Sequence, residues 1–342
     1  MASLRRNPLL GTTIIVSPER MKRVWSGATE TIEEPTLLAY DTRCPLCPSN
    51  TRLSGLRNPP YKGAWSFEND TSALSAPTYP RGIDPRTGHP LFAESRAEGI
   101  CEVLCYHPDH SKNMLRMSVE EIRSVVSLWA DRTNEMKRQG LTYVAIFTTY
   151  GEMLGNSMPH PHGQLWASSH IPPTPKTMLD NQWAYFEQHE QVLLLEYAKQ
   201  EIGRGERVVM ENKNFLAVVP YWAEWPYEIM ILPKRHVTHV ASFSDVERYD
   251  LARMLSDCIR TYAALFALPK LGAPHYLALY QAPIAGDSYP SSQLFVTLST
   301  PLLTATRKKH PAGYEQYFGR QSDVTPEASA LTLRTTAQEV LK

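Results

Sequence analysis

The sequence predicts an α+β fold of two related halves, each an antiparallel β-sheet with helices packed on it. The chain has 342 residues, which suits two domains or one duplicated unit. Hydrophobic residues make up 42% and charged residues 20%, a balance that predicts a packed core. A similar order of elements also occurs twice, although the repeat is weak residue by residue. We therefore divide the chain into residues 1–180 and residues 181–342.

The first hundred residues contain short β-like runs, such as Thr13–Val16, between stretches rich in Pro, Gly, Asn and Ser. We expect strands, turns and loops there that shape a site. The first copy of the repeat follows. It consists of a strand, a helix that opens at Ser118 with acidic residues in its first turn, a second strand, a glycine-containing loop and a histidine-containing strand. The strands of this copy are expected at residues 100–106, 143–148 and 159–167.

The second copy repeats this order in the C-terminal half. A helix opens near Ser244, and strands are expected at residues 227–232, 275–280 and 291–297. The histidines of the strand at 159–167 have no counterparts in the strand at 291–297. Between the copies we expect one long helix, roughly 180–202, and a strand near 215–219. One half thus keeps candidate catalytic residues that the other half lacks.

Composition and charge exclude several classes of protein. The formal net charge is zero, which argues against a nucleic-acid binder that relies on bulk electrostatics. No apolar window approaches the roughly 18 residues of a membrane span, and the N-terminus lacks the layout of a signal peptide. Five cysteines, an odd number, do not suggest a disulfide framework. We therefore expect a cytoplasmic protein.

The strongest local signal is the segment His160-Pro161-His162-Gly163-Gln164. In an extended strand, alternate residues point to one face, so two imidazoles and one amide are presented together. A neutral imidazole is a competent nucleophile toward phosphorus if its other ring nitrogen carries the proton, held by an acceptor such as a backbone carbonyl. Gln164 could donate a hydrogen bond to a phosphoryl oxygen. The alternative is a pair of buried core histidines; Gly163, Gln164 and the preceding glycine loop favour His162 as the nucleophile.

The second signal is Cys44-Pro45-Leu46-Cys47, a spacing that suits tetrahedral zinc. The sequence has no second Cys-x-x-Cys pair, so histidines must complete such a site, and His110 and His160 are the candidates. His107 is the alternative to His110. A redox dithiol and two plain cysteines are the competing interpretations. Zinc bound by His160 would brace the strand that carries His162, a structural role.

At this point the chain resembles the galactose-1-phosphate uridylyltransferase family, a branch of the histidine-triad superfamily. The His160–Gln164 segment continues as Leu165-Trp166-Ala167-Ser168-Ser169, which is similar to the active-site strand of that family. The resemblance covers nearly the whole chain in order. Other similar stretches lie at residues 5–9, 16–23, 67–70, 107–111, 219–226, 232–236 and 312–315. It implies two fused histidine-triad-like halves.

The resemblance also implies an activity and its residues. A histidine attacks the α-phosphate of UDP-glucose, glucose 1-phosphate leaves, and galactose 1-phosphate takes up the UMP group. The family match gives His162 as nucleophile with Gln164 as its phosphoryl partner, and one structural zinc. It further implies a homodimer whose active sites share residues from both subunits. The implied zinc ligands are Cys44, Cys47, His110 and His160; the nucleotide and phosphate residues are Arg20, Arg23, Asn69, Asp70, Gly155 and Ser157; the sugar residues are Lys309, Tyr314, Glu315 and Gln321.

The chain departs from the family pattern at several positions, around the second metal site, the phosphate loop and the sugar segment. Many members carry a second metal, and the matching positions here are Met178, Tyr280, Phe295 and Thr297, so we predict no second metal site. Thr149 and Tyr150 stand where an Asn-Lys pair is usual beside the nucleotide, and we include Thr149 in the nucleotide site. Three alternatives therefore stay open. They are a relative with a different nucleotide or sugar 1-phosphate, a histidine-triad hydrolase or phosphorylase, and a non-catalytic zinc or nucleotide-binding module.

Overall fold

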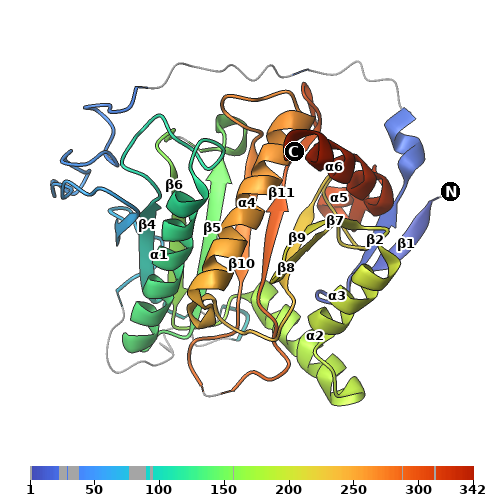
Figure 1. The fold of residues 1–342 in the computed structure, drawn as a ribbon. Helices are drawn as coiled ribbons and strands as arrows, with labels where there is room; N and C mark the ends of the chain where they lie inside the picture. The colour runs from blue at the N-terminus through green and yellow to red at the C-terminus, as the bar shows by residue number, and fades with distance from the viewer. Residues whose placement is uncertain are drawn as a thin grey trace.

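The structure, a computed structural model, describes residues 2–22, 29, 38–76, 90–92, 95–156, 158–286, 288–311 and 313–342. Its centre is a nine-stranded antiparallel sheet in the order β3-β4-β6-β5-β10-β11-β9-β8-β7 (Figure 1). The strands of the N-terminal half are β3 (Trp65–Glu68), β4 (Gly99–Cys105), β6 (His162–Ser168) and β5 (Tyr143–Tyr150). Those of the C-terminal half are β10 (His275–Tyr280), β11 (Phe295–Ser299), β9 (Ile229–Pro233), β8 (Phe215–Val218) and β7 (Val208–Glu211).

The duplication predicted from the sequence is visible in this order. Outward from the central β5/β10 pair, the N-terminal half continues with β6 and β4, and the C-terminal half continues with β11 and β9. The corresponding strands of the two copies, β5 and β10, β6 and β11, and β4 and β9, therefore occupy matching places. The two half-sheets are joined edge to edge, with Thr148 of β5 opposite Leu277 of β10. The α+β prediction is confirmed, and the two sheets form one continuous layer. The predicted boundary at residue 180 falls inside a helix and stays a prediction.

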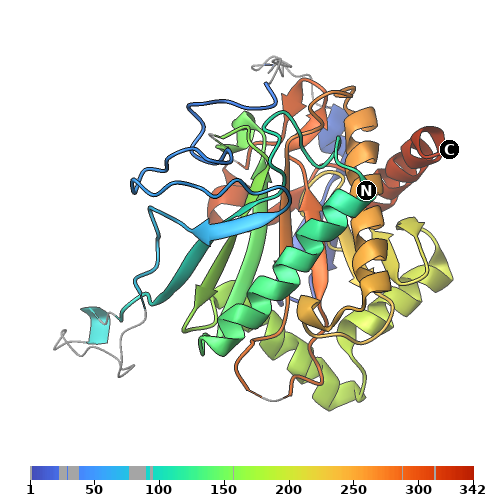
Figure 2. The same cartoon turned by 60° about the vertical axis from the view of Figure 1, so that its left-hand side comes forward.

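Two long helices, α1 (Val119–Arg138) and α4 (Asp245–Leu265), cover one face of the sheet (Figure 2). Both begin where the sequence predicts, because each has a capping box. Ser118 Oγ accepts from Glu121 N–H at 3.2 Å, and the Glu121 carboxylate accepts from Ser118 N–H at 2.7 Å. Ser244 and Glu247 repeat this arrangement at the start of α4. The main core lies between these helices and the sheet.

The other face of the sheet, called the open face below, is covered differently in the two halves. In the C-terminal half it packs against α2 (Pro173–His189), α3 (Leu193–Arg204) and β2 (Thr13–Val16). The prediction of one long helix over 180–202 is wrong. Glu190 adopts a left-handed conformation, φ 53°, that ends α2, and extended Val192 begins α3. In the N-terminal half, Leu46, Cys47 and Tyr61 from the described segment 38–76 pack against β4 on this face.

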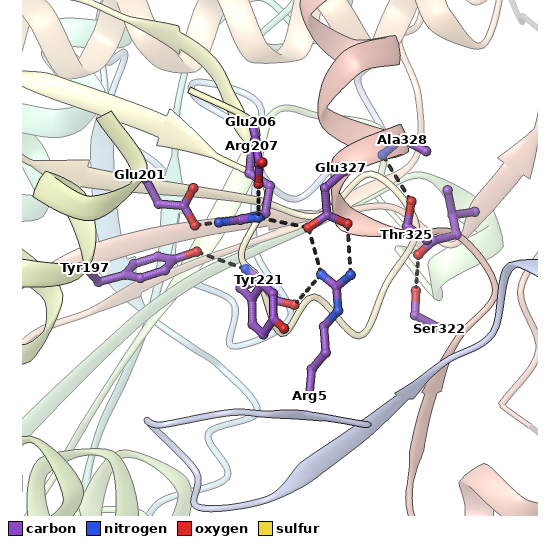
Figure 3. A network of polar contacts seen from close by, with 11 residues as sticks. Arg5, Tyr197, Glu201, Glu206, Arg207, Tyr221, Ser322, Thr325, Glu327 and Ala328 are labelled. Atoms are coloured by element: carbon purple, nitrogen blue, oxygen red, sulfur yellow. Dashed lines mark hydrogen bonds and ion pairs between the residues drawn. The ribbon is translucent and has the colours of Figure 1, made fainter. Parts of the chain in front are cut away.

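The two ends of the chain are tied together. β1 (Ser3–Arg6), β2 and β14 (Arg320–Ser322) form a small sheet, and α6 (Pro326–Val340) follows β14. Arg5 donates two hydrogen bonds of 2.9 Å to Glu327, which also accepts from Arg207 at 2.9 Å; Glu201 accepts from Arg207 at 2.8 Å (Figure 3). The Arg5–Glu327 ion pair holds the N-terminal strand β1 on the C-terminal helix α6, and Arg207 links the same carboxylate to Glu201.

The remaining elements are short. No helix in the described ranges has both the length and the apolarity to cross a bilayer. These short elements are η1 (Pro18–Lys22), η2 (Pro90–Phe92), η3 (Glu152–Leu154), η4 (Val240–Ser242), β12 (Leu302–Thr304), β13 (Arg307–Lys308) and α5 (Tyr314–Tyr317).

Candidate active site

Strand β6 presents its residues alternately to the two faces of the sheet. Leu165 and Ala167 are buried in the core under the helices, whereas His162, Gln164 and Trp166 are half-buried on the open face. This is the period-2 arrangement expected from the sequence. The candidate nucleophile and its candidate phosphoryl partner therefore lie on the same side of one strand.

The imidazole of His162 is held in one tautomer. Its Nδ1 lies 2.8 Å from the carbonyl oxygen of His160, and because a carbonyl can only accept, Nδ1 carries the proton. Nε2 is then left with a free lone pair. Burial lowers the pKa of His162, against a smaller opposing effect of the His160 carbonyl, so the ring is neutral at neutral pH. His162 also lines a cavity together with Tyr106, Thr148 and His275.

Gly163 is required by the side chains beneath it. A Cβ atom at this position would lie 2.0 Å from the Tyr106 hydroxyl oxygen and 2.8 Å from Thr148 Oγ1. These two hydroxyls hydrogen-bond to each other at 2.6 Å, and the Tyr106 ring packs edge-on against Trp129 in the core. Any larger residue would push β6 away and move His162. The sequence shows the glycine but not this reason for it.

Gln164 has a defined amide orientation. Its Oε1 accepts a hydrogen bond of 2.9 Å from the indole N–H of Trp166. The amide NH₂ group is therefore the part that can donate to a ligand on the open face, as an anion such as a phosphoryl group requires.

A cluster that could hold a metal ion lies next to this strand. Cys44, Cys47, His110 and His160 are all buried, and their ligand atoms lie within 4.8 Å of one another. Cys47 Sγ is 3.6 Å from Nδ1 of both histidines. Two thiols and two imidazoles suit a tetrahedral zinc ion.

The protonation of these groups fits a metal ion. The Nε2 of His160 is 3.0 Å from the Tyr61 hydroxyl, which donates onward to the Leu46 carbonyl at 2.5 Å. His160 therefore carries its proton on Nε2 and turns a lone pair on Nδ1 toward the cysteines. Burial raises the pKa of Cys44 to about 12, so a thiolate here needs a cation beside it, which a bound metal ion would provide.

His107 lies outside this cluster. Its Nε2 is 2.9 Å from Glu121 Oε1, and its Nδ1 accepts from the Asp109 backbone N–H at 2.9 Å. Both ring nitrogens are thus engaged elsewhere. Of the two candidates that the sequence left open, the structure brings His110 to the cysteines.

Two asparagines shape the Cys44–Cys47 turn. Asn58 Nδ2 donates to the carbonyls of Pro45 and Cys47 at 2.8 and 2.9 Å, and Asn50 Nδ2 donates to that of Cys44 at 2.8 Å. Neither asparagine, nor Tyr61, was identified from the sequence, because nothing in their spacing marks contacts with this turn.

Comparisons with known proteins agree with these features. Residues 1–172 match the family described as galactose-1-phosphate uridyl transferase, N-terminal domain, and residues 178–341 match its C-terminal domain. The galactose-1-phosphate uridylyltransferase of Haemophilus influenzae is 37% identical over 335 residues, which cover 98% of this chain and 94% of that protein. The chain belongs to the galactose-1-phosphate uridylyltransferase family.

A further relative supports this membership, and a solved structure supports the fold. The galactose-1-phosphate uridylyltransferase of Rattus norvegicus is 39% identical over 336 residues, 97% of this chain and 86% of that protein. A solved uridylyltransferase structure has a TM-score of 0.78 at 22% identity and covers 100% of both chains, which supports the fold alone.

The residues expected to bind sugar in this family form a second cluster. Lys309 Nζ lies 2.7 Å from Glu315 Oε1 and also donates to the backbone oxygens of Glu224 and Gln321. Gln321 donates to Asp323, and Asp323 accepts from Arg20 Nε at 3.0 Å. Tyr314 is 49% exposed at the start of α5. Arg20 therefore lies with the sugar residues at the β2/β14 end of the molecule, and His162 lies on β6 of the other half.

The remaining nucleotide candidates are in part engaged within the chain. Asn69 accepts from Thr71 in a turn, and Asp70 pairs with Arg52 at 3.3 Å and accepts from Ser54 N–H. Gly155 adopts φ 84° and donates its N–H to Glu152 at 2.8 Å. Thr149 is half-buried on β5. Arg23 and Ser157 lie outside the described residues.

Proposed function

We propose that this protein transfers a UMP group between a UDP-hexose and a hexose 1-phosphate, and that His162 carries the group as a covalent adduct. The names of its relatives supply the substrates, galactose 1-phosphate and a uridylyl donor. The observation that carries the mechanism is the hydrogen bond from His162 Nδ1–H to the His160 carbonyl, since it leaves Nε2 unprotonated.

The first step forms a bond between His162 Nε2 and the α-phosphorus of the UDP-hexose. The bond from that phosphorus to the bridging oxygen breaks, and the sugar 1-phosphate leaves with its electron pair. The Nδ1 proton stays in place, so the positive charge of the substituted ring rests against the His160 carbonyl. In the second step, a phosphate oxygen of the incoming hexose 1-phosphate attacks phosphorus and the N–P bond breaks. No external base is needed in either step.

Gln164 donates its NH₂ group to a phosphoryl oxygen as negative charge shifts in the transition state. A zinc ion held by Cys44, Cys47, His110 and His160 would fix His160, whose carbonyl holds the nucleophile's proton. The cysteine and histidine ligands would thus act on the nucleophile through only two residues of backbone.

All five cysteines are free, which is consistent with a cytoplasmic protein.

The sugar cluster supports a homodimer with shared sites. Lys309, Glu315, Gln321 and Arg20 lie together on the C-terminal half, while His162 lies on the N-terminal half. A second copy of the chain would bring the sugar cluster of one subunit to His162 of the other. Asn69, Asp70, Thr149, Gly155, Arg23 and Ser157 would complete the nucleotide side of the site.

Subunit mixing tests the shared site. His162→Gly and Glu315→Gln proteins, each inactive alone, are unfolded together and refolded at equal amounts. Half of the dimers then contain one chain of each kind, and each has one intact site, so about one quarter of wild-type activity should return. No recovery, with mixed dimers shown to form, would contradict the shared site.

The catalytic proposal is tested by UDP-glucose alone, without an acceptor. We expect a burst of glucose 1-phosphate equal to the number of active sites, followed by release of UDP-galactose when galactose 1-phosphate is added. Continuous hydrolysis or phosphorolysis would identify the protein as a hydrolase or phosphorylase instead. Because Thr149 and Tyr150 replace a pair usual in the family, other nucleoside diphosphate sugars and sugar 1-phosphates should be tested in parallel.

A further inference from the structure

We infer that Trp166 is a positioning residue that sets which end of the Gln164 amide faces the phosphoryl group. The inference rests on the proposed function, which gives Gln164 its partner. It adds a residue that acts through one hydrogen bond to Gln164.

The hydrogen bond decides the orientation on chemical grounds. The two ends of a glutamine amide differ little in shape, and only their partners distinguish them. The indole of Trp166 has one N–H donor and no acceptor, so the atom 2.9 Å away from it is the amide oxygen. The NH₂ group is thereby left to the ligand. Without the indole N–H, the amide could turn its carbonyl oxygen toward an anionic phosphoryl group and repel it.

The indole itself is well held. Trp166 packs edge-on against Phe147, with ring centroids 5.7 Å apart and planes at 72°. Phe147 lies directly opposite Gln164 on β5, so it supports both side chains of the pair. The residues opposite Trp166 on its two neighbouring strands are Cys101 and Ala145, whose small side chains leave room for the indole on this face. The donor therefore has a fixed place on the same strand as its acceptor.

Replacement of Trp166 by Phe tests the inference, since it removes the N–H and keeps an aromatic ring. We expect the single-turnover rate of uridylylation by UDP-glucose to fall on the order of 10-fold to 100-fold, with little change in KM. Trp183→Phe, the same change at a tryptophan of α2 that is 46% exposed, is the matched control; its rate should stay close to that of wild type.

A double-mutant cycle separates positioning from general support of the strand. In a Gln164→Ala background the Trp166→Phe change should have no further effect on the rate. An equal loss in both backgrounds, or no loss in the single variant, would overturn the inference. If the wild-type protein forms no adduct, the proposed function fails; if it does and Trp166→Phe is unimpaired, only this inference fails.

A second measurement needs no activity and no Trp166 variant that folds. In protein labelled with ¹⁵N at tryptophan, the indole resonance of Trp166 should move upfield in proton shift and exchange faster with solvent in Gln164→Ala than in wild type. The resonances of the other tryptophans serve as the control. A Trp166 indole signal that is the same in both proteins would show that the hydrogen bond is absent, and the inference would be wrong.

Discussion

The two halves of the sheet have the same strand order, but their side chains on the open face differ. Those of the N-terminal half are polar and could bind a ligand, whereas those of the C-terminal half pack against one another. In the N-terminal half this face carries His162 with its unprotonated Nε2, the amide of Gln164, and the cluster of Cys44, Cys47, His110 and His160. In the C-terminal half the Tyr280 and Phe295 rings stack 4.7 Å apart at 14°, in the same packed cluster as Met178. These are three of the positions where the family's second metal would be expected. The fold thus provides the same platform twice, and within the described residues the cysteine and histidine cluster that could hold a metal ion lies on the N-terminal side.

A pair of glutamines shows the difference most clearly. Gln164 makes one side-chain hydrogen bond and keeps its NH₂ group for a ligand. Gln293 in the C-terminal half is 1% exposed, accepts from Val237 N–H at 3.1 Å and donates to the Arg235 carbonyl at 3.0 Å. A polar residue with every group satisfied inside the chain stabilises the fold, whereas one with a group left over can act on a substrate.

The largest expected effect comes from His162→Gly, which should lower transfer on the order of 10⁴-fold or more because no nucleophile remains. The melting temperature should change little, since His162 is half-buried and makes one local hydrogen bond. Steady-state transfer assays and calorimetry check both statements. Ser292→Ala at the start of the matching segment is the control and should retain activity. Appreciable turnover by His162→Gly would show that His162 is not the nucleophile, and the proposed difference between the two halves would fail.

The two glutamines should respond in opposite ways. Gln164→Ala should reduce transfer on the order of 10²-fold to 10³-fold with little change in stability. Gln293→Ala should leave the activity of the folded protein intact and lower the free energy of unfolding by about 2 kcal/mol, because it leaves the buried Val237 N–H and the Arg235 carbonyl without their partner. Kinetics and urea denaturation of both variants measure this. Similar behaviour of the two variants would mean that the halves do not differ in this way.

Metal content gives a third contrast. The purified protein should contain about one zinc ion per chain, bound in the N-terminal half. Cys44→Ser should lose it, lower the melting temperature and reduce transfer on the order of 10-fold to 100-fold. Cys258→Ala, in α4, should keep the zinc. Elemental analysis measures the zinc content and calorimetry the melting temperature. A Cys44→Ser protein with full zinc content would exclude a zinc site formed by Cys44, Cys47, His110 and His160.

The smallest expected effect is that of Phe295→Leu. Loss of its stacking with Tyr280 should lower the free energy of unfolding by about 1 kcal/mol, with unchanged activity and zinc content. Chemical denaturation and elemental analysis measure this. A change in metal content would show that the C-terminal face still holds an ion.

Sequence patterns predicted the local features of the fold well. The helix starts at Ser118 and Ser244 follow from capping boxes, and the strand at residues 275–280 was placed to the residue, because short-range chemistry sets these elements. The break at Glu190 was missed, since nothing in the apolar pattern marks a non-glycine residue in a left-handed conformation.

For the candidate site, the sequence brought out the residues of the possible metal cluster and missed the residues that support it. Spacing brought out Cys44 and Cys47 and the His162–Gln164 pair, with His160 as a candidate ligand. It left His107 and His110 open, and the family resemblance implied His110, which lies in the cluster. Tyr61, Asn50 and Asn58 contact the cysteine turn or His160 from elsewhere in the chain, and only the folded structure brings them there. That Arg20 lies with the sugar residues depends on the parallel pairing of β2 with β14, which links the two ends of the chain.

The most direct test is to locate the adduct. Protein exposed to UDP-glucose is quenched at alkaline pH, where a phosphoramidate survives, digested and sequenced by mass spectrometry. The account predicts one UMP group on the peptide that contains His160 and His162, attached to His162. Exchange of sugar phosphates at full rate with no modified histidine, or with UMP on another residue, would contradict it.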